Sequence, residues 1–217
     1  MVTKVALEDI HTEKLNYNLP SSAPLFVIND GCLLEKETLS ALPYRFLLLS
    51  SKRRLDLYTP FAHEAINKKF DPFGGQGKEY IDILEKEIFP LCLEGADLDK
   101  VYYGGISLGG LHAIYASTFA SFPIKNYFSI CGSFWFPGFV SYLKEHNRKE
   151  NLSYYLLNGK KEGVKHQDSP LYFAYPLAIE VSDILKEGNR VTFLSDNYSH
   201  HDHLTQRFLS LIKERKP

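Results

Sequence analysis

The sequence predicts an α/β fold in which helices cover both faces of a mostly parallel sheet. Short, continuously apolar runs alternate with segments of helical periodicity along the chain. Continuous apolarity is typical of central parallel strands that are buried on both sides. Hydrophobic residues make up 44% of the 217 residues, which is enough for a sizeable core. Because there is no internal repeat or linker, we expect one domain over residues 1–217, with residues 1–23 as its N-terminal edge segment.

The expected strands are apolar runs that end at glycine, proline or polar residues. They cover residues 25–29, 44–50, 101–103, 127–131, 154–158 and 191–195. A weaker signal around residues 14–19, in the polar N-terminal segment, predicts an edge strand. Strands that alternate with helices in this way favour parallel pairing.

The expected helices carry apolar residues at helical spacing. They cover residues 35–41, 78–92, 174–186 and 204–213, and a further helix begins just after Ser107. Pro43 ends the first helix. Gly188 is expected to close the helix over 174–186 in a left-handed conformation. The helix after Ser107 is expected to have one apolar face, formed by Leu111, Ile114, Tyr115 and Phe119.

The charge pattern argues against several classes of partner. The chain has 25 basic and 26 acidic residues, a formal net charge of -1, and no basic stripe that would indicate nucleic-acid binding. No apolar run is long enough to span a membrane, and the first residues carry charges where a signal peptide has an apolar core. We therefore expect no nucleic-acid and no membrane partner.

Cysteine and histidine spacing predicts neither a metal nor another cofactor. Cys32, Cys92 and Cys131 are scattered and odd in number, which indicates reduced thiols and favours the cytoplasm. Residues 200–203 read His-His-Asp-His, and a metal site is the alternative interpretation of this cluster. Adjacent residues rarely bind one ion together, and the sequence has no partner cluster.

The stretch Gly105-Ile106-Ser107-Leu108-Gly109 lies between an expected strand and an expected helix. A Gly-x-Ser-x-Gly turn in this context is typical of a nucleophile elbow. The serine backbone is strained at the strand tip, and glycine on both sides avoids collisions with neighbouring segments. The helix that follows directs its unpaired N–H groups toward the group that the serine attacks. We therefore interpret Ser107 as a nucleophile.

A serine nucleophile needs a base, and the base needs a group that orients it. The loops after parallel strands gather at one sheet edge, and the α/β-hydrolase order is serine, acid, histidine. Glu162 follows the strand over 154–158, and His200 and His201 follow the strand over 191–195. We predict Glu162 as the acid, with Asp168 as the alternative. His200 is the predicted base because it comes first after the last strand, and His201 is the alternative.

Ester hydrolysis also needs donors for the tetrahedral oxyanion. The backbone N–H of Leu108, the residue after the nucleophile, is the first predicted donor. The second is expected from the loop after the strand over 25–29, at the amide of Gly31 or Cys32. An aromatic stretch after the strand over 127–131 is predicted either to wall an acyl or aryl pocket or to belong to the core. Its residues are Phe134, Trp135 and Phe136.

With these residues assembled, the chain resembles the esterase-like branch of the α/β-hydrolases. That branch includes siderophore esterases, S-formylglutathione hydrolase (esterase D) and mycolyl acyltransferases. The matching pieces are Asn29-Asp30-Gly31, Arg54, Tyr58-Thr59-Pro60, Phe73-Gly74-Gly75, the elbow through Leu111, Ser133-Phe134-Trp135, Gly159 to Glu162, the terminal histidines and Arg207. The chain departs from the family where Ser199, instead of glycine, precedes the histidine, and it lacks large cap insertions. The resemblance implies an α/β-hydrolase fold and serine hydrolysis of carboxylic esters with Ser107, Glu162 and His200.

The predicted function is therefore a cytoplasmic carboxylesterase that acts through an acyl-enzyme on a small-molecule ester. Acyl transfer to another acceptor and thioester hydrolysis are alternatives, because the same residues serve all three reactions. A non-catalytic binding module on a hydrolase scaffold is a further alternative. The sequence leaves the acyl group, the alcohol and the oligomeric state, a homo-oligomer included, open.

Overall fold

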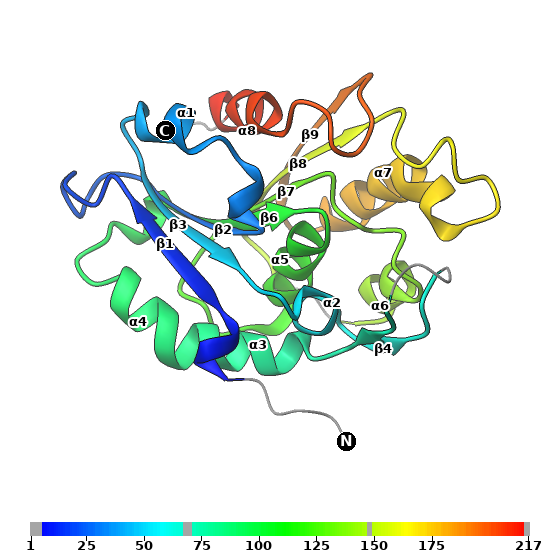
Figure 1. Ribbon diagram of the computed structural model, residues 1–217, viewed down its shortest axis with the longest axis horizontal. Helices are drawn as coiled ribbons and strands as arrows, with labels where there is room; N and C mark the ends of the chain where they lie inside the picture. Colours follow the sequence, from blue (N-terminus) through cyan, green and yellow to red (C-terminus); the bar gives the residue numbers. More distant parts are fainter. Residues whose placement is uncertain (1–5, 67–70, 147–148, 215–217) are drawn as a thin grey trace.

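The computed structural model describes residues 6–66, 71–146 and 149–214, and a seven-stranded sheet forms its centre (Figure 1). The strand order is β1-β3-β2-β6-β7-β8-β9, and every pairing is parallel except that of β1 with β3. The strands are β1 (His11–Leu15), β2 (Leu25–Asn29), β3 (Arg45–Ser50), β6 (Val101–Ile106), β7 (Asn126–Ile130), β8 (Ser153–Gly159) and β9 (Arg190–Asp196). The predicted α/β fold with a mostly parallel sheet is confirmed.

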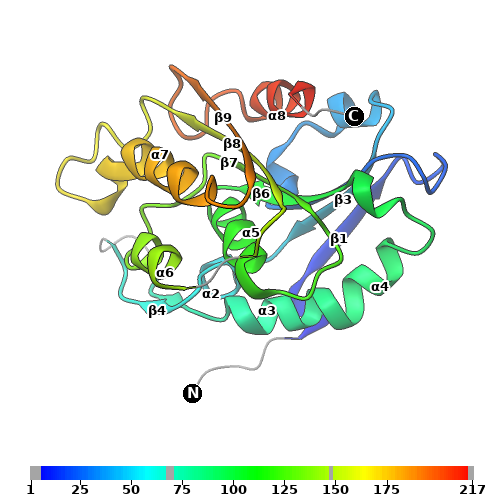
Figure 2. The same ribbon diagram turned by 180° about the vertical axis from the view of Figure 1, so that it is seen from behind.

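Helices cover both faces of this sheet (Figures 1 and 2). On one face lie α1 (Lys36–Ser40) and α8 (Leu204–Lys213). On the other lie α3 (Gly77–Ile83), α4 (Phe89–Cys92), α5 (Leu108–Phe119), α6 (Phe139–Glu145) and α7 (Ala174–Leu185). The short helix α2 (Arg54–Leu57) precedes a two-stranded ribbon of β4 (Ala62–His63) and β5 (Phe73–Gly74). Among the described residues, no helix combines the length and apolarity needed to cross a membrane.

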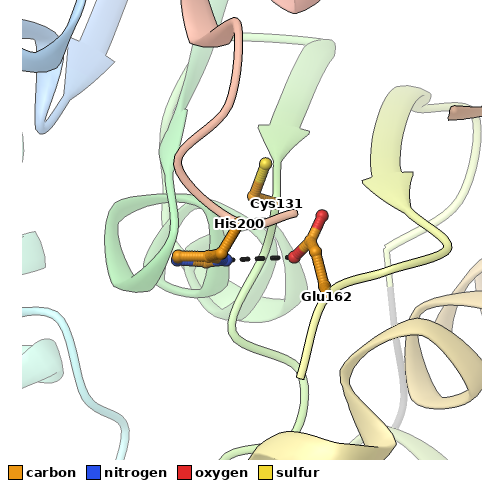
Figure 3. A group of neighbouring side chains, drawn as sticks. All are labelled: Cys131, Glu162 and His200. Carbon is orange, nitrogen blue, oxygen red and sulfur yellow. Dashed lines mark hydrogen bonds and ion pairs between the residues drawn. The ribbon is translucent and has the colours of Figure 1, made fainter. Parts of the chain in front are cut away.

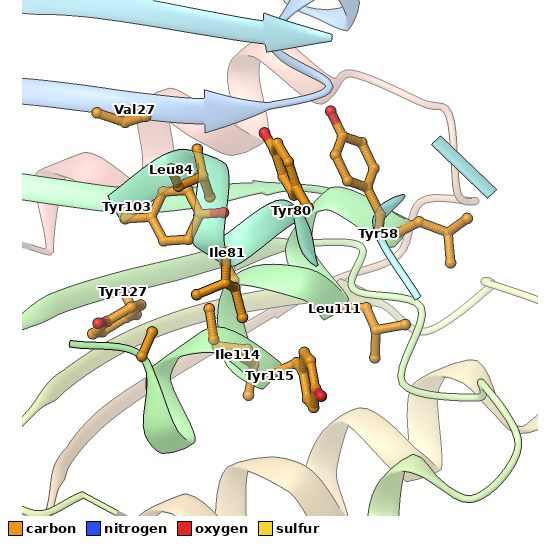
Figure 4. Packing of buried hydrophobic residues seen from close by; sticks show 14 of the residues in the cluster. Val27, Tyr58, Tyr80, Ile81, Leu84, Tyr103, Leu111, Ile114, Tyr115 and Tyr127 are labelled. Atoms are coloured by element: carbon orange, nitrogen blue, oxygen red, sulfur yellow. The ribbon is translucent and has the colours of Figure 1, made fainter. Parts of the chain in front are cut away.

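Successive strand residues divide the core into two clusters, because side chains alternate across a sheet. Val27 and Tyr103 point toward α3 and α5, where Tyr80, Ile81 and Ile114 pack against them (Figure 4). Phe26, Tyr102 and Phe128 point to the opposite face, against Phe208 of α8.

The helix α5 is buried on nearly all sides, so the prediction of a single apolar face was too narrow. Every residue from Leu108 to Thr118 is buried, and Phe119 is 38% exposed. The helix is buried in this way because it lies against β6 and β7 and has α3 on another side. A helix enclosed in this way needs small or apolar residues around its whole circumference.

Several element boundaries differ from the sequence predictions for local reasons. The edge strand β1 ends at Leu15, not at residue 19, because Asn16 takes a left-handed turn with φ 59. The side-chain amide of Asn16 donates hydrogen bonds to the backbone carbonyls of Leu39, Leu42 and Tyr44. The helix expected over 78–92 contains a π-helical turn, Leu84–Ile88, between α3 and α4. Helix α6 and the β4–β5 ribbon are not among the elements predicted from the sequence.

Candidate active site

Ser107 stands at a strained turn between β6 and α5. Its backbone has φ 57 and ψ −121, a conformation that non-glycine residues rarely adopt. A Cβ at Gly105 would lie 2.6 Å from the backbone carbon of Gly109 and 2.7 Å from the carbonyl oxygen of Asn29. A Cβ at Gly109 would lie 2.7 Å from the Cβ of Asn29. The tight approach of β6, α5 and β2 therefore requires both glycines.

His200 connects Ser107 to a buried carboxylate. Its Nε2 lies 2.9 Å from Ser107 Oγ. Its Nδ1 lies 3.0 Å from Glu162 Oε2, a contact drawn in Figure 3. The Glu162 side chain is 1% exposed and the His200 side chain 27%. The three residues come from turns after β6, β8 and β9, as expected when the carboxyl ends of parallel strands meet at one edge.

Neighbouring groups hold the Glu162 carboxylate in place. Its Oε1 accepts the backbone N–H of Gly159 at 2.5 Å, and its Oε2 lies 3.4 Å from the Asn158 amide nitrogen. The Arg207 guanidinium lies 3.7 Å from Oε1. A buried carboxylate with several donors keeps a defined orientation, so it can fix the imidazole of His200.

The two alternative residues lie elsewhere. The His201 ring is 4.8 Å from the His200 ring and lines the adjoining cleft, but Ser107 bonds to His200. The pKa of His201 is lowered mainly by partial burial, and the charges of His200 and Arg54 lower it further. Asp168 is exposed, and the described carboxylate in contact with His200 is that of Glu162.

Cys131 lies beside Glu162 and His200, and one donor atom from each of these residues falls within 4.8 Å of the others (Figure 3). Metal binding requires a thiolate. Burial and the nearby Glu162 charge instead raise the pKa of the Cys131 thiol well above its usual value. The sulfur also accepts a hydrogen bond from Arg207 Nη1 at 2.7 Å, and a cation at that position opposes a metal ion. The arrangement of Cys131, Glu162 and His200 is therefore better explained as a hydrogen-bonded cluster than as a metal site.

The loop predicted to supply an oxyanion donor follows β2, which pairs with β6 so that Asn29 faces Gly105. Asp30 adopts a left-handed conformation with φ 55, and Gly31 and Cys32 form the turn that follows. Arg54 fixes this loop, since its Nη2 and Nε donate to the Asp30 carboxylate at 2.6 and 3.1 Å. Leu108 begins α5, where the first N–H groups have no partner within the helix.

Ser107 opens onto a cleft of about 620 Å³. The residues that line it are Arg54, Leu55, Ile66, Phe73, Ser107, Leu108, Trp135, Glu162, Gly163, His166, Leu171, Ala174, His200 and His201. The lining surface is mainly apolar, and Arg54, Ser107, Glu162 and the three histidines provide its polar part.

The aromatic stretch after β7 divides between cleft and core. Trp135 lines the cleft, whereas Phe134 and Phe136 are 0% and 2% exposed and lie in the core, so their assignment to the pocket is corrected. Phe134 stacks on Phe139 of α6, and Phe136 packs edge-on against Phe73. A tight turn after Cys131 directs the two phenylalanines inward, and sequence spacing does not reveal that direction.

Three other contributors to the site were not predicted from the sequence. Ser133, which is fully buried, has its Oγ 3.2 Å from Ser107 Oγ. His166 and Leu171 line the cleft from the segment between β8 and α7. The Ser133 position was visible as part of a family motif, but nothing in its spacing indicated contact with the nucleophile.

The sheet order, the elbow and the helices on both faces define an α/β-hydrolase fold. The IroE-like serine hydrolase from Shewanella oneidensis superimposes with a TM-score of 0.71 at 15% identity, over 94% of this chain and 79% of that chain. The BES protein from Bacillus cereus gives 0.68 at 18% identity, over 94% and 87%. Siderophore hydrolase EstB from Aspergillus nidulans gives 0.64 at 14% identity, over 94% and 87%. At these identities the likeness establishes the fold.

Sequence similarity extends over a shorter segment. No protein-family model matches the chain. The uncharacterized protein YbbA of Bacillus subtilis (strain 168) is 29% identical over 92 residues, which is 41% of this chain and 37% of that protein.

Proposed function

We propose that the protein is a serine hydrolase that cleaves carboxylic esters through an acyl-enzyme. Ser107 is the nucleophile, His200 the general base, and Glu162 the residue that orients His200. The single observation that carries the proposal is the continuous hydrogen-bonded series from Ser107 Oγ through His200 to Glu162, at the edge of an apolar cleft. A nucleophile, its base and an orienting acid in this geometry are the parts that acyl transfer requires.

In the first step Ser107 Oγ attacks the ester carbonyl carbon, and its proton passes to His200 Nε2. The new Oγ–C bond forms while the carbonyl π pair moves to oxygen, which gives a tetrahedral oxyanion. Glu162 stabilises the imidazolium by accepting the Nδ1 proton in a hydrogen bond. The oxyanion collapses, the C–O bond to the alcohol breaks, and His200 Nε2 returns the proton to the leaving oxygen.

In the second step water repeats the sequence on the acyl-enzyme. The water oxygen attacks the acyl carbon while His200 accepts a proton from the water. His200 then returns the proton to Ser107 Oγ as the carboxylic acid leaves. In both steps the oxyanion is proposed to accept hydrogen bonds from two backbone N–H groups. One is that of Leu108, and the other is that of Gly31 or Cys32 in the loop after β2. The Asp30–Arg54 pairing supports this assignment, because it holds that loop beside the elbow.

The comparisons support the reaction class. Structures with this fold include an IroE-like serine hydrolase and a siderophore hydrolase, so both of these proteins are named as hydrolases. The proposal for this chain extends to a small-molecule ester as substrate, a single domain, a cytoplasmic location and catalysis without a metal. Three cysteines that form no disulfide are in keeping with a reducing compartment.

The test combines labelling with turnover. Wild-type protein should react with a fluorophosphonate probe and hydrolyse p-nitrophenyl acetate, with activity that survives EDTA. Ser107→Ala should lose both properties, whereas Ser195→Ala, at an exposed position on β9, should keep them. Undiminished turnover by Ser107→Ala would exclude the proposed nucleophile.

A further inference from the structure

Ser133 contacts the proposed nucleophile with its backbone and with its side chain. Its N–H donates to the Ser107 carbonyl oxygen at 3.1 Å, and its Oγ lies 3.2 Å from Ser107 Oγ. The turn that carries Ser133 is tightly held. The Cys131 N–H donates to the Leu157 carbonyl, and a Cβ at Gly132 would collide with Phe134. The hydroxyl of Ser133 is therefore presented to Ser107 from a rigid support.

The direction of the Ser133–Ser107 hydrogen bond follows from the other bonds of the site. The Glu162 carboxylate can only accept, so the Nδ1 of His200 carries the proton between them. In the neutral imidazole Nε2 is then an acceptor, and Ser107 must donate its single hydroxyl proton to it. Ser107 Oγ has no second proton to give. The bond between the two serines therefore runs from the Ser133 hydroxyl to a lone pair of Ser107 Oγ.

We propose that Ser133 is a further catalytic residue, whose hydroxyl stabilises the negative charge that develops on Ser107 Oγ during attack. This proposal rests on the function proposed above. Ser107 Oγ uses one lone pair to form the bond to the carbonyl carbon and another to accept from Ser133. Its own proton leaves for His200 Nε2, and the carbonyl π pair moves to the substrate oxygen. Ser133 keeps its proton throughout.

The bond is stronger in the transition state than in the resting enzyme, because hydrogen bonds to charged oxygens are shorter and stronger than those to neutral ones. Only such differential stabilisation raises the rate of the chemical step. The same bond also holds the Ser107 hydroxyl toward His200 before attack. The backbone contact of Ser133 does not depend on its side chain, so removal of the hydroxyl isolates the proposed effect.

Ser129 of β7, the strand that leads into the turn with Ser133, provides a matched control. Its hydroxyl is also fully buried, and among the described residues it has no hydrogen-bond partner. Ser133→Ala and Ser129→Ala therefore remove the same group from comparable surroundings, and only the first removes a contact with Ser107. Ser133→Cys keeps the approximate size of the side chain with a weaker donor.

The experiment measures the rate of fluorophosphonate labelling and kcat/KM for p-nitrophenyl acetate, with thermal unfolding of each variant. Ser133→Ala should lower both rates roughly ten- to hundredfold, the range for one hydrogen bond to a charged group. Ser133→Cys should fall between this variant and the wild type, and Ser129→Ala should retain the wild-type rates. If Ser133→Ala does not fold, the loss of rate in folded Ser133→Cys decides the question.

Two results separate this proposal from the proposed function. If wild-type protein is labelled at Ser107 and Ser133→Ala reacts as fast as Ser129→Ala, the role of Ser133 is overturned and the nucleophile stands. If wild-type protein is neither labelled nor active, the proposed function fails, and the role of Ser133 fails with it.

Discussion

Arg207 and Glu162 form a buried ion pair behind the proposed base, with 3.7 Å between Arg207 Nη2 and Glu162 Oε1. His200 contacts the other carboxylate oxygen. Arg207 also makes two hydrogen bonds to Asp196, at 2.7 and 2.6 Å, and one to the Ser199 carbonyl at 3.1 Å. One guanidinium from α8 thus holds the acid, the end of β9 and the residue before His200.

Replacement of Arg207 should reduce both stability and activity. The side chain is 2% exposed, and loss of one partner of a buried ion pair costs about 3–5 kcal/mol of unfolding free energy. Arg207→Met should show this loss in urea denaturation together with a fall in kcat, because the loop of His200 loses its anchor. Arg190→Met, at an exposed position on β9, should change stability by less than about 0.5 kcal/mol. Equal stability of Arg207→Met and wild type would contradict the anchoring role.

The two tandem histidines should differ sharply in their effect on turnover. His200→Ala removes the group that contacts Ser107, and kcat should fall by about 10⁴-fold or more. His201→Ala removes a cleft residue whose described ring contact is with His200, so its kcat should remain within about tenfold of wild type. Hydrolysis of p-nitrophenyl acetate by the two variants measures this contrast. A larger loss in His201→Ala than in His200→Ala would reverse the assignment of the base.

A methyl group at Gly105 should not be tolerated. It would lie 2.6–2.7 Å from backbone atoms of α5 and β2, which cannot move aside as a flexible side chain can. Gly105→Ala should therefore cost about 3 kcal/mol, the upper end of the range for overpacking, and should displace Ser107. Gly138→Ala is the control for a positive φ without crowding, because a Cβ at Gly138 would lie 3.7 Å from its nearest neighbouring atom. This variant should lose about 1–2 kcal/mol of unfolding free energy. Denaturant unfolding of both variants provides the comparison.

His112 should make stability depend on pH below neutrality. Its Nδ1 accepts from the Tyr103 hydroxyl and its Nε2 donates to the Gly77 carbonyl, and burial lowers its pKa to about 4. The unfolded chain, with a histidine pKa of about 6.5, binds more protons between these values. Stability should therefore fall as the pH drops from about 6.5 to 4, by up to about 3 kcal/mol.

His112→Gln should lose this pH dependence, although its stability at pH 7 is lower because the hydrogen bonds change. His11→Gln, at an exposed position on β1, should retain the pH dependence of the wild type. Unfolding free energies measured at several pH values between 4 and 7 report the difference. An unchanged slope in His112→Gln would show that other groups cause the acid sensitivity.

Trp135 should set the preference for the acyl group. It lines the cleft beside apolar residues such as Phe73, and the centroids of the two rings are 6.4 Å apart. Trp135→Ala should reduce the preference for p-nitrophenyl hexanoate over the acetate by roughly tenfold, because each methylene loses apolar contact. Phe136→Leu, a change in the core behind the cleft, should leave the ratio unaltered. A ratio that shifts equally in both variants would exclude a specific role for Trp135.

The sequence alone determined the strands, the elbow and the chain order of the candidate residues. Apolar runs such as Leu25–Asn29 and the glycines around Ser107 act locally, because burial on two faces and a crowded turn restrict which residues fit. That is why the α/β fold and the resemblance to esterase-like hydrolases could be stated from the residues. The predicted preference for His200 and Glu162 came from their positions after strands, and the structure places His200 against Ser107 and Glu162 against His200.

Only the tertiary structure decided which side chains share the cleft. Phe134 and Phe136 turn into the core while Trp135 between them does not, and the contact of Ser133 with Ser107 crosses from one strand end to the next. Arg207 joins two loops from a helix that follows both. These relationships depend on the direction of turns and on the twist that brings strand ends together. Neither is encoded in the spacing of residues along the chain.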